Sequence, residues 1–323
     1  MERTVFRVVV LVLALSVAGC SERSDVVLKE KPPASDDPST VTEKPDATKM
    51  ESPEALEALG ASVRRDDAGD VIVVRLGDGK ATDEAAALLV GMESLKDLQL
   101  SGEAVTDAAI ESIKGLGKLK VAKLDVTSVS DAGLENLGAM KNLEQVYLSA
   151  TKITDAGLAS IGKLPRLRRL RISNNQVTGE GMIHFKSAPA LTNLDVSKTT
   201  VDDTGLKHLK NIATLTDLNL YTTPVTDAGL EHLATMTQLK WLNLDNTKIT
   251  DAGLPNLEPL TNLEFLHLGR TPVSDEGVEV LFGLKNLKRL EVTNTNVSEE
   301  MAQKLRDALP ECEVLSGVTD KKS

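Results

Sequence analysis

A phrase of five residues recurs along this 323-residue chain every 24 residues without an insertion, and this period constrains the fold more than any other feature. The phrase reads Thr-Asp-Ala-Gly-Leu where it begins at Thr154, Thr226 and Thr250. Such a period is typical of solenoids, in which each unit buries its apolar face only against its neighbours. The second residues of the ten phrases are 83, 107, 131, 155, 179, 203, 227, 251, 275 and 299.

Two kinds of apolar spacing flank each phrase. Apolar residues recur nine and seven positions before its second residue, and a spacing of two is that of a β-strand. After the phrase they recur every three residues, as in Leu230, Leu233 and Met236, which is typical of a helix. Each unit is therefore predicted to be a short strand, a turn and a short helix. The glycine of the phrase permits close approach of the next unit.

The unit as a whole, L-x-x-L-x-L-x-x-T-x-I-T-D-A-G-L, resembles the leucine-rich repeat. It is most similar to the F-box and cysteine-containing type and to bacterial exported proteins with the same phrase. The resemblance covers residues 71–309, which hold ten 24-residue units, and implies an α/β fold: a horseshoe-shaped leucine-rich-repeat solenoid with a parallel β-sheet on its concave face and short helices on its convex face. Where those families carry Asn or Cys, this chain carries Thr in seven units and Asn175 in another. We expect these hydroxyls to bond the backbone of the neighbouring turn.

Capping segments are predicted at both ends, because a solenoid must cover its terminal apolar faces. Residues 51–70 form the N-terminal cap, with a helix from Ser52 to about residue 59 and the start of a hairpin. Residues 310–323 form the C-terminal cap and tail, which follow a last helix over 301–309. Cys312 lies in a predicted edge strand and is expected to be a small buried residue, with a reactive thiol as the alternative.

The N-terminus has the pattern of an exported lipoprotein. Residues 1–19 combine two arginines, a short apolar run and small residues, which is typical of a signal peptide. A transmembrane anchor is the alternative, but a span needs about 20 apolar residues. The stretch from Leu15 to Cys20 resembles a lipobox, which implies cleavage before Cys20 and a lipid on its sulfur. Residues 20–50 are then the anchor site and a disordered tether. The protein is expected on the cell envelope, at the outer membrane if the host has one, because Ser21 is not Asp.

Composition excludes several classes of function. The net charge of −11 argues against a nucleic-acid binder. The sequence has no Ser/His/acid triad, no phosphate-binding Gly-rich loop, no H-E-x-x-H and no C-x-x-C. We therefore predict neither an enzyme nor a cofactor. Two metal sites are alternatives, calcium on the aspartates of the phrase and zinc on His184, His208 and His232. We favour helix caps and surface histidines instead, so no metal is expected.

The informative positions lie between the core leucines of each strand. Side chains ten, eight and six positions before the phrase point away from the core, onto the concave face. Four of the six aromatic residues after position 20 fall there. The alternative is that strands simply favour aromatic residues. We predict a ligand-binding surface, because interfaces are enriched in Trp, Tyr and Arg. The predicted contacts are Trp241, Phe265, Arg289, His267, Tyr221, Tyr147 and Arg171.

The predicted function is non-catalytic binding of a protein or peptide on this concave face, by a monomer anchored to the membrane through Cys20. A carbohydrate or cell-wall binder and a ligand-free structural spacer remain as alternatives. The repeat resemblance also implies substrate recognition for a ubiquitin ligase. We reject that role, because the signal peptide and tether leave no room for an F-box domain.

Overall fold

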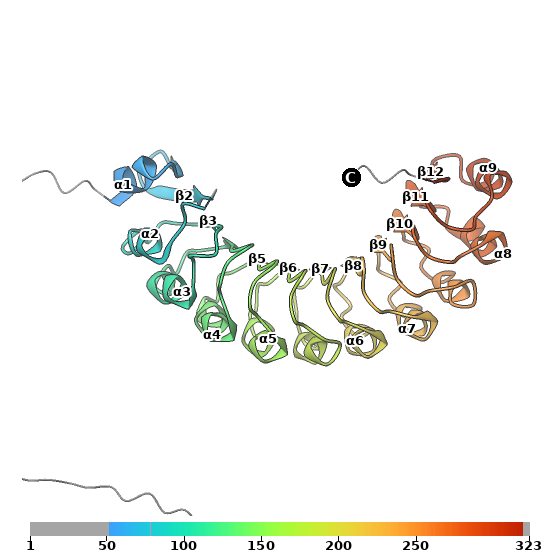
Figure 1. The fold of residues 1–323 in the computed structure, drawn as a ribbon, viewed down its shortest axis with the longest axis horizontal. Coiled ribbons are helices and arrows are strands. Elements are labelled where there is room, and N and C mark those ends of the chain that lie inside the picture. Colours follow the sequence, from blue (N-terminus) through green and yellow to red (C-terminus); the bar gives the residue numbers. More distant parts are fainter. Residues whose placement is uncertain (1–51, 78, 319–323) are drawn as a thin grey trace, which may run out of the picture. The chain divides into compact units, whose positions relative to one another are not determined.

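The computed structural model describes residues 52–77 and 79–318. The predicted signal peptide, the anchor site at Cys20 and the tether therefore lie outside the described residues. The described residues coil into an open arc whose strands line the inner side and whose helices line the outer side (Figure 1). This is the α/β leucine-rich-repeat solenoid that the sequence predicts.

The described strands form one sheet of twelve, ordered as in the chain. β1 is antiparallel to β2, and every later strand is parallel to its neighbour. In the parallel pairs each residue lies 24 positions from its partner, as Leu242 from Leu266. The strands are β1 Ser62–Arg65, β2 Val71–Leu76, β3 Asp97–Leu100, β4 Val121–Lys123, β5 Gln145–Tyr147, β6 Arg169–Arg171, β7 Asn193–Asp195, β8 Asp217–Asn219, β9 Trp241–Asn243, β10 Phe265–His267, β11 Arg289–Glu291 and β12 Glu313–Leu315.

The helices begin at the second residue of the phrase in eight of the ten units. The other two units have 3-10 turns instead: Gly179 replaces the aspartate before η1, and Pro255 lies within η2. No described helix has the length and apolar character to cross a membrane. The helices are α1 Ser52–Ala58, α2 Asp83–Ala87, α3 Asp107–Ile113, α4 Asp131–Ala139, α5 Asp155–Ile161, η1 Glu180–Phe185, α6 Asp203–Leu209, α7 Asp227–Leu233, η2 Leu254–Leu257, α8 Asp275–Val278, η3 Glu279–Gly283 and α9 Glu299–Ala308.

The core is a stack of aliphatic side chains that runs the length of the coil. Its repeated positions are almost all Leu, Ile or Val and are fully buried, as at Leu242 and Leu266. Among the described residues, Phe185 is the one aromatic side chain that is fully buried. Because each coil is thin and repeats the same apolar positions, the chain folds with few aromatic residues.

The aspartate of the phrase joins one unit to the next. The Asp107 carboxylate accepts hydrogen bonds from the Ser130 hydroxyl (2.6 Å) and from the backbone amides of Ser130 (2.7 Å) and Gly133 (3.0 Å). The first residue of the phrase caps its own helix, as predicted, since Thr106 accepts from the Ala108 amide. The bonds to the next unit's hydroxyl and amide recur at Asp83, Asp107, Asp131, Asp155, Asp203, Asp227, Asp251 and Asp275.

We call this set of hydrogen bonds, from the phrase aspartate to the next unit, the bracket. It explains why the phrase contains a glycine. A Cβ at Gly133 would lie 2.5 Å from an oxygen of Asp107, so a larger residue would displace the carboxylate. Both oxygens of each of these carboxylates accept from NH or OH groups of the next unit, so the aspartates have a structural role. Within residues 52–77 and 79–318, no three His, Cys, Asp or Glu side chains are grouped so as to hold a metal ion.

The threonine column differs from our prediction. Each hydroxyl donates to a carbonyl three residues earlier in its own unit, as from Thr247 to Leu244 (2.6 Å), rather than to the neighbouring turn. At this position no threonine hydroxyl of the described residues bonds the backbone of a neighbouring unit, although that of Thr151 also lies 3.0 Å from the side-chain oxygen of Asn175, whereas the amide of Asn175 does reach that backbone. Its Nδ2 donates both to Leu148 (2.7 Å) in the preceding unit and to Ile172 (3.0 Å) in its own.

The terminal elements lie where the sequence predicts them. α1 packs Leu56 into the core, and the β1–β2 hairpin follows it. At the other end, β12 continues the 24-residue register from β11. Cys312 is 8% exposed, and burial raises the pKa of its thiol. These observations favour the small buried residue over the reactive thiol.

Candidate functional site

The inner strands alternate as the concave-face prediction requires. In β9, Leu242 is buried, whereas Trp241 and Asn243 are half-buried and face the inner side. The same alternation holds from β3 to β11. The side chains ten and eight positions before each phrase therefore form two ladders across the concave face, which we call the ten-before and eight-before ladders.

An aromatic stack stands on the ten-before ladder. The rings of Trp241 and Phe265 lie 4.8 Å apart between centroids with an interplanar angle of 5°. The ring of His267 lies 6.4 Å from that of Phe265 and is tilted by 55°. Arg289 is next on the ladder but faces acids instead, with its Nε 2.7 Å from Glu291. The stack is thus a rigid two-ring platform.

A charged network of His267, Asp245, Glu291, Arg270 and Arg289 lies beside this platform. His267 stands between two carboxylates, with Nε2 3.1 Å from Glu291 and Nδ1 3.5 Å from Asp245. Asp245 is only 2% exposed and makes a two-point pair with the Arg270 guanidinium. This hydrogen bonding raises the pKa of Arg270. The Arg270 guanidinium also lies 5.1 Å from the centroid of the Tyr221 ring. His267 and Tyr221 therefore belong to a charged network rather than to an aromatic strip.

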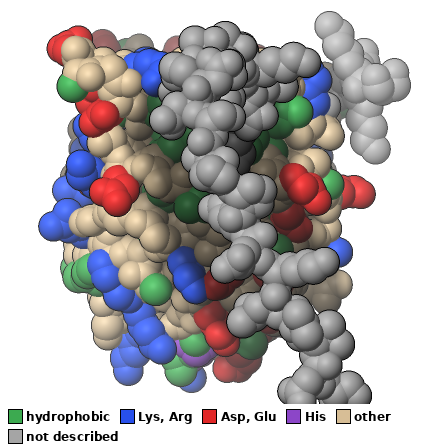
Figure 2. All heavy atoms as spheres, turned by 90° about the vertical axis from the view of Figure 1, so that its left-hand side faces the viewer, with side chains coloured by type: hydrophobic (Ala, Val, Ile, Leu, Met, Phe, Trp, Pro, Cys, Tyr) green, Lys and Arg blue, Asp and Glu red, His purple; other side chains and the backbone are tan. Residues whose placement is uncertain are grey.

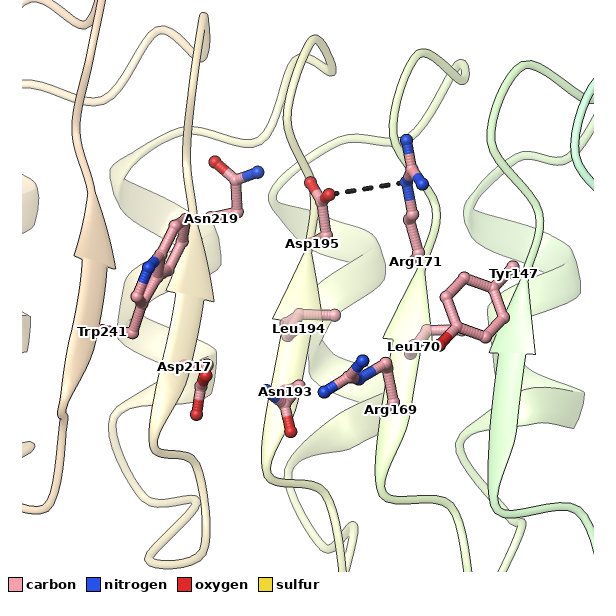
Figure 3. Close-up of a pocket in the computed structure, with 10 residues that line it drawn as sticks. All are labelled: Tyr147, Arg169, Leu170, Arg171, Asn193, Leu194, Asp195, Asp217, Asn219 and Trp241. Carbon is pink, nitrogen blue, oxygen red and sulfur yellow. Dashed lines mark ion pairs between the residues drawn. The ribbon is translucent and has the colours of Figure 1, made fainter. Parts of the chain in front are cut away.

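A groove of about 330 Å³ occupies the concave face from β5 to β9. Tyr147 stands at one end and Trp241 at the other, and Leu170 and Leu194 form part of its floor (Figure 3). Short polar side chains on β7 and β8 keep the middle open. The lining residues are Tyr147, Arg169, Leu170, Arg171, Asn193, Leu194, Asp195, Asp217, Asn219 and Trp241.

The polar side chains of the groove differ in how far they are already engaged. Arg171 lies 3.6 Å from Asp195, an ion pair drawn in Figure 3. Asn219 accepts from the backbone amide of Tyr221 (3.1 Å), which fixes its orientation. Asp217 accepts from the Thr216 hydroxyl (2.6 Å) and pairs with no cation of the described residues.

The groove gathers only part of the predicted contact set. Tyr147, Arg171 and Trp241 line it, and Phe265 supports Trp241 from behind. The other predicted contacts, Arg289, His267 and Tyr221, lie in the charged network. Our prediction missed Arg169, Asn193, Asp195, Asp217 and Asn219 as lining residues. Their place on the two ladders is the signal that identifies them.

The end of the coil where the repeats begin has a different character. Figure 2 shows acidic and basic side chains interspersed on that side of the molecule. A surface with both signs of charge gives no directional field for a ligand of one sign. The concave groove is therefore the better-defined candidate site.

Fold and groove together define a class: an open leucine-rich-repeat solenoid with an exposed concave sheet. Residues 163–185 and 260–282 match the family model described as Leucine Rich repeat. Among solved structures, an internalin (inlF) from Listeria monocytogenes is 18% identical with a TM-score of 0.51, over 83% of this chain and 93% of that one. An internalin C2 (inlC2) from the same organism is 21% identical with a TM-score of 0.49, over 67% and 85%. None of the curated proteins compared with the chain matches it. At 18% identity, the likeness to the inlF structure shows the fold alone.

Proposed function

We propose that this protein is a non-catalytic binder that takes a protein or peptide segment into the concave groove. The observation that supports this is a groove with an aromatic side chain at each end, Tyr147 and Trp241, on the concave sheet. The ends lie four strands apart, which is about 19 Å at about 4.8 Å per strand. An extended peptide covers about 3.4 Å per residue, so the groove fits about six residues.

The groove is preorganised for such a ligand. Phe265 holds Trp241 by ring stacking, and the backbone holds Asn219 by a hydrogen bond. Side chains that are already ordered lose little entropy when a ligand binds. Rigid aromatic residues are also the commonest anchors of protein interfaces. The other predicted contacts, Arg289, His267 and Tyr221, lie outside the groove lining and would contact the ligand at the edge of the binding surface.

The proposed setting is the cell envelope. Removal of residues 1–19 and lipidation of Cys20 would anchor the protein to the membrane. Residues 20–50 would then serve as a tether, 51–70 and 310–323 would cap the solenoid, and the repeats between them would bind the ligand. Cys20→Ala should release a soluble or uncleaved product, as measured by membrane fractionation and by the mass of the N-terminus. A mature protein that begins at another residue and carries no lipid would contradict this address.

A random dodecapeptide display library, panned against the full-length chain, tests the function. Trp241→Ala and Phe265→Ala should each weaken selected peptides about thirtyfold, which corresponds to about 2 kcal/mol. Both side chains are half-buried on the concave face, so the melting temperature should change little. Lys240→Ala and Lys288→Ala, adjacent in sequence to the ladders, serve as controls. Equal affinities in all four variants would refute a concave binding face.

A carbohydrate ligand is the second candidate. The accessible indole of Trp241 next to the amide of Asn219 also suits a sugar, whose CH face stacks on aromatic rings. A glycan array probed with the full-length chain separates this candidate from the peptide. Silence in both assays would favour a structural spacer.

A further inference from the structure

We propose that the groove recognises an arginine side chain of the bound peptide, with its guanidinium on the open face of Trp241 and against the carboxylate of Asp217. The proposal rests on the peptide-binding function and names the residue type that this end of the groove selects. Three observations carry it: the open face of Trp241, the unpaired charge of Asp217, and the hydrogen-bond donor that the Asn219 amide places beside them.

Trp241 has one covered and one open face. β9 lies between β8 and β10, and Phe265 of β10 stacks in parallel on the indole. The opposite face of the ring therefore looks toward β8, where Asp217 is the cross-strand partner of Trp241. Figure 3 shows Asp217 and Asn219 on this strand, on the groove side of the indole. An aspartate is much shorter than an indole, so the outer part of the ring stays accessible.

Asp217 differs from every other acid on the two ladders. Each of those acids already pairs with an arginine, whereas Asp217 has only the Thr216 hydroxyl, on Oδ2, among the described residues. Its Oδ1 is left to accept from a ligand. The pairs of the other acids are Asp97–Arg75, Asp195–Arg171, Glu291–Arg289 and Glu313–Arg289.

This arrangement selects a planar cation. A guanidinium can stack on an indole and at the same time donate in its own plane to a carboxylate, whereas an ammonium offers charge without a flat face. The net charge of −11 adds a long-range attraction for basic peptides.

The rest of the groove favours a peptide in one orientation. Asn219 accepts through Oδ1 from the Tyr221 amide, so its Nδ2 is available to donate to a peptide carbonyl next to the bound side chain. Arg169 and Arg171 stand on β6, two strands from Asp217. They repel a cation at their own end and so confine it to the end of the groove formed by β8 and β9.

Trp241 is the single tryptophan of the chain, so its fluorescence reports on this subsite without a label. The probe is the tripeptide acetyl-Gly-Arg-Gly-amide, titrated into the full-length chain. Its isosteric analogue, with citrulline in place of arginine, lacks the charge. We expect saturable quenching by the arginine peptide and about tenfold weaker binding of the citrulline peptide.

Two matched variants assign the effect to one carboxylate. Asp217→Asn keeps the shape of the side chain and should abolish the preference for arginine over citrulline. Asp97→Asn removes a carboxylate from the same ladder, one that lies outside the groove lining and already pairs with Arg75, and should leave the preference intact. Equal affinity for the two tripeptides, absence of quenching by either, or an arginine preference that survives in Asp217→Asn would each overturn the proposal.

The display library separates this proposal from the function beneath it. Selected peptides that need Trp241 but tolerate replacement of every arginine by citrulline would overturn the arginine subsite and leave peptide binding in place. A library without binders, together with quenching that depends on Asp217, would leave a guanidinium site and overturn peptide binding.

Discussion

Replacing one bracket aspartate should destabilise the solenoid by an amount that follows from its hydrogen bonds. Asp107→Ala removes three acceptor contacts, to the hydroxyl and amide of Ser130 and to the amide of Gly133. Hydrogen bonds to a charged group contribute about 1.5–3 kcal/mol each, and we take about 1 kcal/mol each because Asp107 is half-exposed. The expected loss is therefore about 3 kcal/mol. Asp107→Asn keeps an acceptor for both amides and should lose about 1 kcal/mol.

Urea unfolding followed by circular dichroism measures this loss, with thermal melting as a second readout. A loss of 3 kcal/mol corresponds to a fall of about 6–12 °C in melting temperature for a domain of this size. Asp67→Ala, in the exposed turn between β1 and β2, is the control and should leave the midpoint unchanged. If the free energy of unfolding of Asp107→Ala lies within about 0.5 kcal/mol of the parent value, the bracket does not hold neighbouring coils together, and apolar stacking alone must do so.

Four further predictions follow from single features of the coil. Hydrogen bonds from the next unit's serine lower the pKa of Asp275 in the folded protein. The carboxylate therefore stabilises the fold fully above about pH 4, and this stabilisation is lost as the pH falls through the pKa of the folded state. The melting temperature of Asp275→Asn should accordingly approach that of the parent as the pH is lowered toward about pH 2. Cys312 should not react with Ellman's reagent in the native chain and should react in urea, so rapid native labelling would contradict its burial. Val126 adopts φ of 58°, where asparagine is better tolerated, so Val126→Asn should gain and Asn174→Val should lose about 1 kcal/mol by urea midpoint. Deletion of 203–226 should leave a folded coil by circular dichroism, whereas a deletion of half that length should not.

Much of the fold can be predicted from the sequence because position in the period determines which side of the coil a residue faces. The spacing of two before the phrase predicts the buried residue of each strand, as at Leu242, and hence the exposed neighbours on either side. The caps follow from the same argument, since the terminal units need cover. The 3-10 turns that replace the α-helices of two units are explained by Gly179, which takes the place of the aspartate at the helix start, and by Pro255, which lacks the N–H that an α-helix would use at its position.

The partners of polar side chains could not be predicted in this way. A column in the sequence gives the face on which a side chain lies, but not how far the side chain reaches. The hydroxyl of Thr247 stops at its own unit, whereas the carboxylate of Asp107 crosses to the next. For the same reason, the sequence predicts that the concave aromatic and charged residues form one continuous binding surface. In the structure Arg289 and His267 turn to acids, and the open groove lies nearer the middle of the sheet.

The distribution of aromatic residues bears on whether the concave groove is functional. Packing of the described coil uses two of them, Phe185 in the core and Phe282 partly buried against it, and aliphatic residues fill the other core positions. The other four aromatic residues of the described coil face the concave side, where the repeat itself demands no particular residue. Strand propensity would scatter them evenly over twelve strands. Instead, Trp241 and Phe265 stack on adjacent strands, and Trp241 and Tyr147 bound one groove. Such grouping at positions that the fold leaves free supports the proposal that these side chains serve a ligand and not the coil.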